Sequence, residues 1–209
     1  MTTLLLVHGG LWEEGMGADR FWREPGISAG LEEHDFEVLA PDRRHHAPDW
    51  TAEASHLASA LPRSPVTVLA GSNGCSAAAR LALDFPGTVA GLILAWPATA
   101  NDPAVDAHER AHLAGLGASD EVIRALLEGQ TLRGLTDKEL AGLPMPVAVI
   151  SSALPNAFHQ RHVVDTLLKL LPAAAELLAC PEPPRPEFPP YLKSFVSAVA
   201  AFARPRTGM

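Results

Sequence analysis

Short apolar runs alternate with helical patterns along most of this chain. The apolar runs are continuous rather than alternating with polar residues, which is typical of parallel strands that helices cover on both faces. The pattern predicts about six strands, at Leu4–His8, Phe36–Ala40, Val66–Ala70, Val89–Ala95, Val147–Ser151 and Glu176–Cys180. It predicts helices between them, at roughly Ile27–Glu33, Ala52–Leu61, Gly74–Asp84, Arg161–Leu171 and Pro190–Ala203.

This alternation predicts an α/β fold with a doubly wound, mostly parallel sheet. Residues 97–144 depart from it, because they carry helical patterns without a strand. Ser119 precedes two acidic residues that favour a helix start, and Thr136 with Glu139 forms a capping box. We therefore expect a single domain over residues 1–209, with 97–144 inserted as a short helical lid over the carboxyl ends of the strands.

Composition excludes several classes of partner. The 209 residues carry a net charge of -8, which argues against the basic surface that nucleic acids and anionic membranes require. No apolar run approaches the ~20 residues of a membrane span. The 2 cysteines, Cys75 and Cys180, are too few for a disulfide framework, so we expect them to be reduced and the protein to be cytoplasmic.

A serine stands in the tight turn Ala70-Gly71-Ser72-Asn73-Gly74. An apolar run precedes the turn, and an alanine-rich helical pattern follows it. Strand, turn with serine and helix together form the context of a nucleophile elbow, in which only small neighbours such as Ala70 and Gly74 fit. We expect Ser72 to sit there with its hydroxyl exposed.

Several segments together resemble the α/β-hydrolase superfamily over nearly the whole chain. One is similar to the strand and oxyanion loop that open such domains, one to the next strand and its turn, and one to the family elbow, with Ala70 replacing its first glycine. Others resemble the helix end and strand after the elbow, and the segment after the family's catalytic histidine. In chain order these are Leu4–Gly10, Val38–Asp42, Ala70–Gly74, Asp84–Leu92 and Phe188–Leu192. The usual leading hairpin is missing, so the form is minimal.

The resemblance implies that Ser72 is the nucleophile. It also implies that the backbone N–H groups of Asn73 and of Gly10 or Leu11 form an oxyanion hole. Two positions depart from the family pattern. Asn156, which cannot be an anion, is the best match for the acid, and Glu187, with Arg185 as the second choice, stands at the position of the histidine base. The catalytic triad is incomplete on this alignment.

A displaced base is the remaining route to triad chemistry. His159 lies three residues after Asn156, in a loop expected at the catalytic end of the sheet. Glu187 could itself act as a base if it were buried. His8, His45 and His46, or a histidine of the lid, are further candidates.

A metal-binding motif occurs in the lid. The segment His108-Glu109-Arg110-Ala111-His112 matches the zinc signature His-Glu-x-x-His. It is hydrophilic and lacks an evident third ligand, so we expect no metal and no other cofactor.

Trp12 and Trp96 follow strands and are expected at the carboxyl edge, where open α/β sheets bind ligands. Aromatic walls there suit an apolar small molecule. Because acid and base are missing, the sequence favours a non-hydrolytic enzyme of the cyclase, isomerase, epimerase or lyase type. Two alternatives stay open: a serine esterase or thioesterase with a displaced base, and a non-catalytic module that binds a ligand.

Overall fold

Six parallel strands form one sheet in the computed structural model, which describes residues 2–204. The strand order is β2-β1-β3-β4-β5-β6, and every neighbouring pair is parallel. The strands span Thr2–Val7 (β1), Phe36–Leu39 (β2), Val66–Gly71 (β3), Val89–Ala95 (β4), Val147–Ser152 (β5) and Ala175–Cys180 (β6). The predicted doubly wound α/β fold is confirmed, and the predicted strand ends differ by at most two residues.

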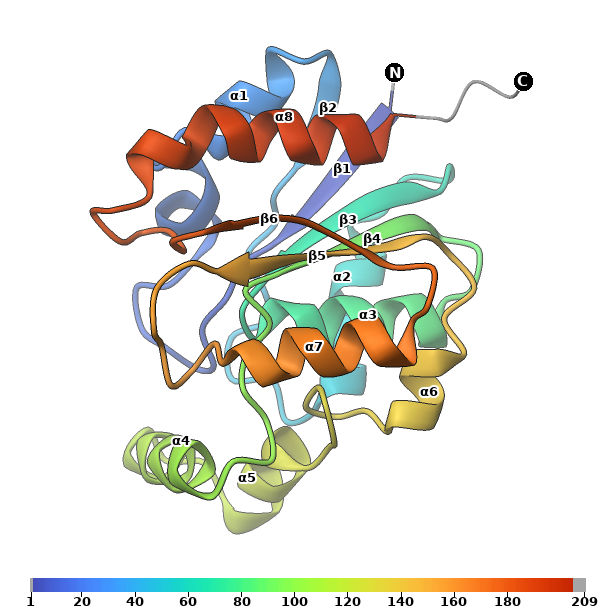
Figure 1. The fold of residues 1–209 in the computed structure, drawn as a ribbon. Coiled ribbons are helices and arrows are strands. Elements are labelled where there is room, and N and C mark those ends of the chain that lie inside the picture. The colour runs from blue at the N-terminus through green and yellow to red at the C-terminus, as the bar shows by residue number, and fades with distance from the viewer. Residues whose placement is uncertain (1, 205–209) are drawn as a thin grey trace.

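Helices cover both faces of the sheet (Figure 1). Helices α1 and α8 lie on one face, and α2, α3 and α7 lie on the other. Their bounds are Ile27–Glu32 (α1), Trp50–Ser59 (α2), Gly74–Asp84 (α3), Arg161–Leu170 (α7) and Leu192–Ala203 (α8). The last helix starts later than predicted, because Pro189–Tyr191 forms a 3-10 turn before it. A short π-helix at Asp19–Arg23 has no counterpart among the predicted helices.

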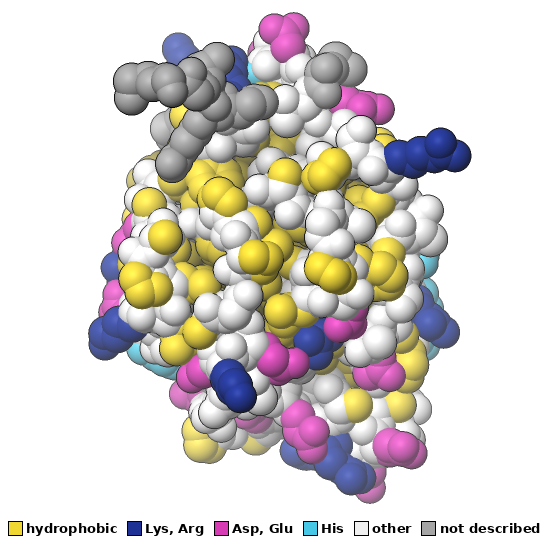
Figure 2. Space-filling view, turned by 90° about the vertical axis from the view of Figure 1, so that its right-hand side faces the viewer, with side chains coloured by type: hydrophobic (Ala, Val, Ile, Leu, Met, Phe, Trp, Pro, Cys, Tyr) yellow, Lys and Arg dark blue, Asp and Glu magenta, His cyan; other side chains and the backbone are white. Residues whose placement is uncertain are grey.

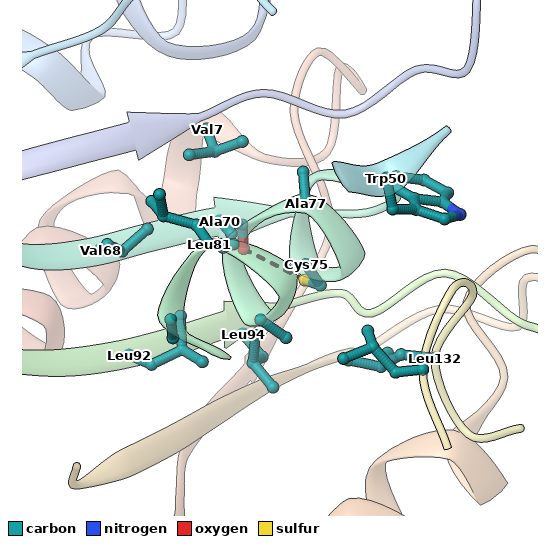
Figure 3. Packing of buried hydrophobic residues seen from close by; sticks show 14 of the residues in the cluster. Val7, Trp50, Val68, Ala70, Cys75, Ala77, Leu81, Leu92, Leu94 and Leu132 are labelled. Atoms are coloured by element: carbon teal, nitrogen blue, oxygen red, sulfur yellow. Dashed lines mark hydrogen bonds between the residues drawn. The ribbon is translucent and has the colours of Figure 1, made fainter. Parts of the chain in front are cut away.

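Two apolar cores lie on opposite sides of the sheet. Successive side chains of β1 alternate between them: Leu5 packs toward α2 and α3, whereas Leu6 packs toward α1 and α8. Figure 3 shows the first core, where Leu81 and Cys75 of α3 approach the sheet. The Cys75 thiol donates to the Ala70 carbonyl oxygen at 3.4 Å, so this cysteine belongs to the packing of the elbow helix on its strand.

The segment between β4 and β5 carries three helices. They span Pro103–Gly115 (α4), Asp120–Leu127 (α5) and Asp137–Ala141 (α6). Each begins at a side-chain cap, from Asp102, Ser119 and Thr136 respectively, and the third has the predicted capping box with Glu139. Capping explains why this segment is helical although its helices are short.

The amino ends of the strands form the face shown in Figure 2, where hydrophobic and uncharged side chains predominate over the middle and charged ones gather toward the lower part. The predicted nucleophile Ser72 lies at the opposite edge of the sheet, where the strands have their carboxyl ends. None of the helices between residues 2 and 204 has the length and apolar character that crossing a membrane requires.

Candidate active site

Ser72 occupies a strained turn between β3 and α3. Its φ is +53°, a left-handed conformation that is rare outside glycine. The turn is fixed on one side by the Ser72 N–H, which donates to the Ala95 carbonyl of β4 at 3.0 Å. On the other side, a Cβ at Gly74 would lie 2.5 Å from the His8 carbonyl oxygen and 2.7 Å from that of Val7. Only glycine lets α3 start this close to β1, so the sequence holds Ser72 at the end of its strand.

A cavity of about 530 Å³ opens in front of Ser72. We call it the Ser72 cavity. Its wall combines apolar side chains, backbone of the loop after β1, and polar groups from α4 and from the loops after β5 and β6. The lining residues are Gly10, Leu11, Glu13, Met16, Phe21, Ser72, Asn73, Ala98, Thr99, Val105, His108, Glu109, His112, Arg133, Asn156, Phe158, His159, Glu182, Pro183, Pro184 and Arg185.

His159 is hydrogen-bonded to Ser72. Its Nε2 lies 2.9 Å from Ser72 Oγ, and its Nδ1 lies 3.1 Å from Glu182 Oε1. Asn156 Nδ2 also lies 2.9 Å from Nδ1, but this amide donates to Glu182 Oε1. A carboxylate only accepts hydrogen bonds, so the contact of Nδ1 with Glu182 assigns the ring proton of a neutral imidazole to Nδ1. Nε2 is then free to accept the hydroxyl proton of Ser72. This is the arrangement by which a general base activates a serine.

Glu182 is the anion behind His159. It follows β6 by two residues and is buried. Its Oε1 also accepts from Asn156 Nδ2 and forms an ion pair with Arg185, whose Nε lies 2.9 Å away, while Oε2 accepts from Ser152 Oγ at 3.0 Å. Burial by itself raises the pKa of Glu182, but the hydrogen bond and charge of His159, with the bond from Asn156, outweigh burial and hold the pKa at about 2. Glu182 is therefore a carboxylate at neutral pH.

His159 and Glu182 come from loops in the opposite order to the base and acid that the family resemblance implies. The resemblance puts the acid after the strand that is β5 and the base after the strand that is β6. Here His159 follows β5 and Glu182 follows β6. The exchange needs no change of fold, because β5 and β6 are neighbours and their carboxyl ends meet at one edge. Asn156, at the expected acid position, instead donates to Glu182.

The loop after β1 supplies the backbone wall opposite His159. Within residues 2–204, the N–H groups of Leu11 and Asn73 have no hydrogen-bond acceptor, and both residues line the Ser72 cavity. Both N–H groups are therefore available to an acceptor bound in the cavity.

A buried ion pair holds this loop in place. Arg43 Nη1 donates to the Gly10 carbonyl at 2.6 Å, and its Nη2 pairs with Glu53 Oε1 at 2.7 Å. His8 adds a second anchor, since its Nδ1 lies 2.7 Å from the Gly9 carbonyl and its Nε2 accepts the Arg43 N–H at 2.9 Å. Burial, followed by the charge of Arg43, lowers the pKa of His8. His8 thus serves the loop as a neutral structural histidine.

Three predicted site residues lie outside the Ser72 cavity. Glu187 is exposed on the surface, beside Phe188, which is buried. Trp96 is fully buried under α8, where its Nε1 donates to the Cys180 carbonyl at 2.9 Å and its ring stacks on Phe195. Trp12 is not among the residues that line the cavity; it stacks on His46 and its Nε1 donates to the Ala47 carbonyl at 3.0 Å. Gly10, Leu11, Asn73, Asn156 and His159 do line the cavity.

The lid motif also reaches the cavity. His108, Glu109 and His112 of α4 line it, and the His108 ring lies edge-on to Phe158. Among residues 2–204, no group of three or more His, Cys, Asp or Glu side chains is placed to hold a metal ion. The expected absence of a metal stays a prediction.

Glu182 is the site residue that sequence reasoning missed. Alignment on Phe188-Pro189-Pro190 drew attention to Glu187, five residues further on. Its position in the chain could have identified it, because Glu182 is the first ionisable residue after the last strand and residues there lie at the carboxyl edge of the sheet.

Solved structures share this architecture at low sequence identity. A meta-cleavage product hydrolase of Pseudomonas fluorescens is 15% identical, with a TM-score of 0.68 over 97% of this chain and 90% of its own. A hydrolase of Pseudomonas aeruginosa is 19% identical, with a TM-score of 0.67 over 96% of this chain and 89% of its own. An extracellular α/β-hydrolase of a Paenibacillus species is 14% identical, with a TM-score of 0.67 over 98% of this chain and all of its own.

These likenesses establish the fold: the chain has the α/β-hydrolase fold. Neither a protein-family model nor a curated protein sequence matches it.

Proposed function

We propose that this protein is a serine hydrolase that cleaves an ester or thioester of a small, mainly apolar molecule. One observation carries the proposal: Ser72 Oγ lies 2.9 Å from His159 Nε2, and the other ring nitrogen of His159 faces the carboxylate of Glu182. Nucleophile, base and orienting anion are the parts that acyl transfer requires.

The reaction would proceed through an acyl-enzyme. Ser72 Oγ attacks the carbonyl carbon while its proton passes to His159 Nε2, and the carbonyl oxygen becomes an oxyanion. The carbon–oxygen or carbon–sulfur bond to the leaving group then breaks, and His159 returns the proton to the departing alcohol or thiol. A water molecule repeats the sequence on the acyl-enzyme, releasing a carboxylic acid and free Ser72.

The remaining groups of the site fit this chemistry. The N–H groups of Leu11 and Asn73 are suited to bind the oxyanion, and such donors are each worth about 10²–10³ in rate. Glu182 would stabilise the imidazolium that forms on His159. Leu11, Phe21 and Val105 offer apolar surface for the acyl or alcohol portion.

A non-hydrolytic reaction, which the sequence favoured, rested on the absence of a base near Ser72. A histidine within hydrogen-bond distance supports the esterase or thioesterase alternative instead.

Covalent labelling tests the proposal. A fluorophosphonate probe should label the wild-type protein stoichiometrically at Ser72, and short-chain p-nitrophenyl esters or acyl thioesters should turn over. Ser72→Ala should lose both signals, whereas Ser194→Ala, which changes an exposed serine on α8, should keep both. A folded protein that neither reacts with the probe nor hydrolyses any ester or thioester would refute the proposal.

A further inference from the structure

A buried arginine lies in the wall of the Ser72 cavity. Arg133 stands between α5 and α6, and its side chain is only 2% exposed. It lines the cavity together with Thr99 and Val105, on the side formed by the inserted helices. The mechanism proposed above gives this cation no task.

Arg133 has more hydrogen-bond donors than partners. Its Nη2 donates to the Thr99 carbonyl at 3.1 Å and to Asp106 Oδ1 at 3.0 Å. Its Nε and Nη1 are buried and have no acceptor within residues 2–204. A guanidinium carries five N–H donors, so three remain unused. Leaving buried donors of a charged group without acceptors is costly, and such groups are normally satisfied.

The backbone around Arg133 leaves it little freedom to turn away. The next residue, Gly134, has φ +72°, and a Cβ there would lie 2.1 Å from the Trp50 ring. Gln130 N–H donates to the Leu135 carbonyl at 2.9 Å, which closes the loop around Arg133. The free Nε and Nη1 atoms are covered in this structure, so an acceptor from the cavity reaches them only after a small movement of the cavity wall. The cavity is where a ligand can enter.

We propose that Arg133 binds a carboxylate of the substrate, so that the ester or thioester cleaved at Ser72 carries a free carboxylate group elsewhere in the molecule. This inference rests on the proposed hydrolase function. A carboxylate fits better than a phosphate, because Asp106 and Glu109 lie nearby and repel a dianion more strongly than a monoanion. Arginine presents its donors in a planar fork that matches carboxylate geometry.

Matched substrates test the inference on the wild-type protein. The probes are 4-methylumbelliferyl half-esters of glutaric, adipic and suberic acid, each compared with the same compound capped as a methyl ester. The free acid of the best-fitting length should have a kcat/KM about 10- to 100-fold higher than its neutral partner, the range expected for a charge-assisted hydrogen bond. Equal rates for acid and methyl ester at every length would overturn the inference.

Variants locate the preference at Arg133. Arg133→Gln should reduce the ratio of kcat/KM for the free acid to kcat/KM for the methyl-capped ester to about one, whatever its effect on the absolute rates. Arg80→Gln is the matched control, because Arg80 also pairs with carboxylates, those of Asp84 and Glu139, but lies outside the cavity. If Arg80→Gln removed the preference equally, the effect would be a general loss of ion pairing and the inference would fail. Should Arg133→Gln not fold, the wild-type comparison still decides.

Binding separates the inference from the proposed function. Monomethyl adipate and dimethyl adipate are titrated calorimetrically into Ser72→Ala, with and without Arg133→Gln. The half-acid could bind in a way that depends on Arg133 although the wild-type protein cleaves no ester. That result would refute the proposed hydrolase function and support the carboxylate site at Arg133. Ester turnover without any preference for the free acid would support the proposed hydrolase function and refute the carboxylate site at Arg133.

Discussion

The two halves of the Ser72 site are built in different ways. On one side, the elbow and the loop after β1 offer backbone N–H groups, and close backbone packing at Gly74 and the buried pair of Arg43 with Glu53 hold them. On the other side, His159 and Glu182 meet as side chains from two loops. The first half depends on the local path of the chain, whereas the second requires only that the right atoms arrive at the right distance.

This difference explains which half can be rearranged. An elbow must lie between a strand and a helix, so its position in the sequence is fixed. An imidazole and a carboxylate can come from either of two adjacent loops, since only their mutual geometry matters to the serine. The loops after β5 and β6 are adjacent, and here the first carries the histidine His159 and the second the carboxylate Glu182.

Removing the base should have the largest effect. His159→Gln leaves Ser72 without a group to take its proton, so we expect kcat for ester hydrolysis to fall by about 10⁴-fold or more. His162→Gln, an exposed histidine at the start of α7, should retain full activity. Steady-state kinetics on a p-nitrophenyl ester measures both. Comparable losses in the two variants would mean that the catalytic base is not His159.

Replacing the anion tests the exchanged order of the loops. Glu182→Gln should lower kcat by about 10²–10⁴-fold, because the imidazole loses the group that orients its proton and stabilises its charge. Glu187→Gln is the counterpart at the position that the family alignment favours, and we expect its kcat to stay within about twofold of wild type. If Glu187→Gln were the damaging change, the family alignment would be right and the site described here wrong.

Sequence patterns predicted the path of the chain around Ser72 well. Apolar runs located every strand, and the small-residue turn located Ser72, because strand, turn and helix each leave a local signal. Trp96 shows the limit of this reasoning. Its place after a strand suggested the ligand edge, but its indole packs under α8, where Phe188 and Phe195 contact it. The direction of a side chain at the end of a strand depends on tertiary packing.

The side-chain half of the site could not be predicted from the sequence for a related reason. In the sequence His159 is only one of several candidate bases, and the family alignment points to Glu187 rather than Glu182. His159 and Glu182 lie in different loops, so no sequence motif of fixed spacing marks their pairing. The unused donors of Arg133 were equally hidden, since only the folded chain shows that this arginine is buried and in the cavity wall.

Loss of the buried ion pair in the backbone half should lower the stability of the protein. Arg43→Met leaves Glu53 buried and unpaired, which we expect to lower the free energy of unfolding by about 3–5 kcal/mol. Arg161→Gln, which removes an exposed arginine paired with Asp165 and Glu176, should cost at most about 1 kcal/mol. Urea denaturation followed by circular dichroism compares them. The expectation fails if the two variants are equally stable.

A second substitution separates packing from positioning in that half. Arg43→Met combined with Glu53→Leu removes both charges and should recover much of the lost stability. Activity should stay low, because the Gly10 carbonyl loses its Arg43 donor and the loop after β1 keeps only its anchor at His8. Recovery of both stability and activity would show that the loop after β1 keeps its shape without the arginine.

The side-chain half should have the smaller effect on stability, and that effect should depend on pH. The pKa of Glu182 is lowered from 4.5 to about 2 in the folded protein. A lowered pKa stabilises the fold fully above pH 4.5, and this contribution is lost as the pH falls toward 2; it amounts to about 3 kcal/mol. In Glu182→Gln this part of the acid destabilisation should be absent, so the stabilities of variant and wild type should converge between pH 4.5 and pH 2. Urea melts at half-unit pH steps measure the convergence. The difference in unfolding free energy between wild type and variant could instead stay constant over this range. Glu182 would then gain no charge-dependent stability from His159 and Asn156, and the hydrogen bonds among these three loop residues would not be what holds this half of the site together.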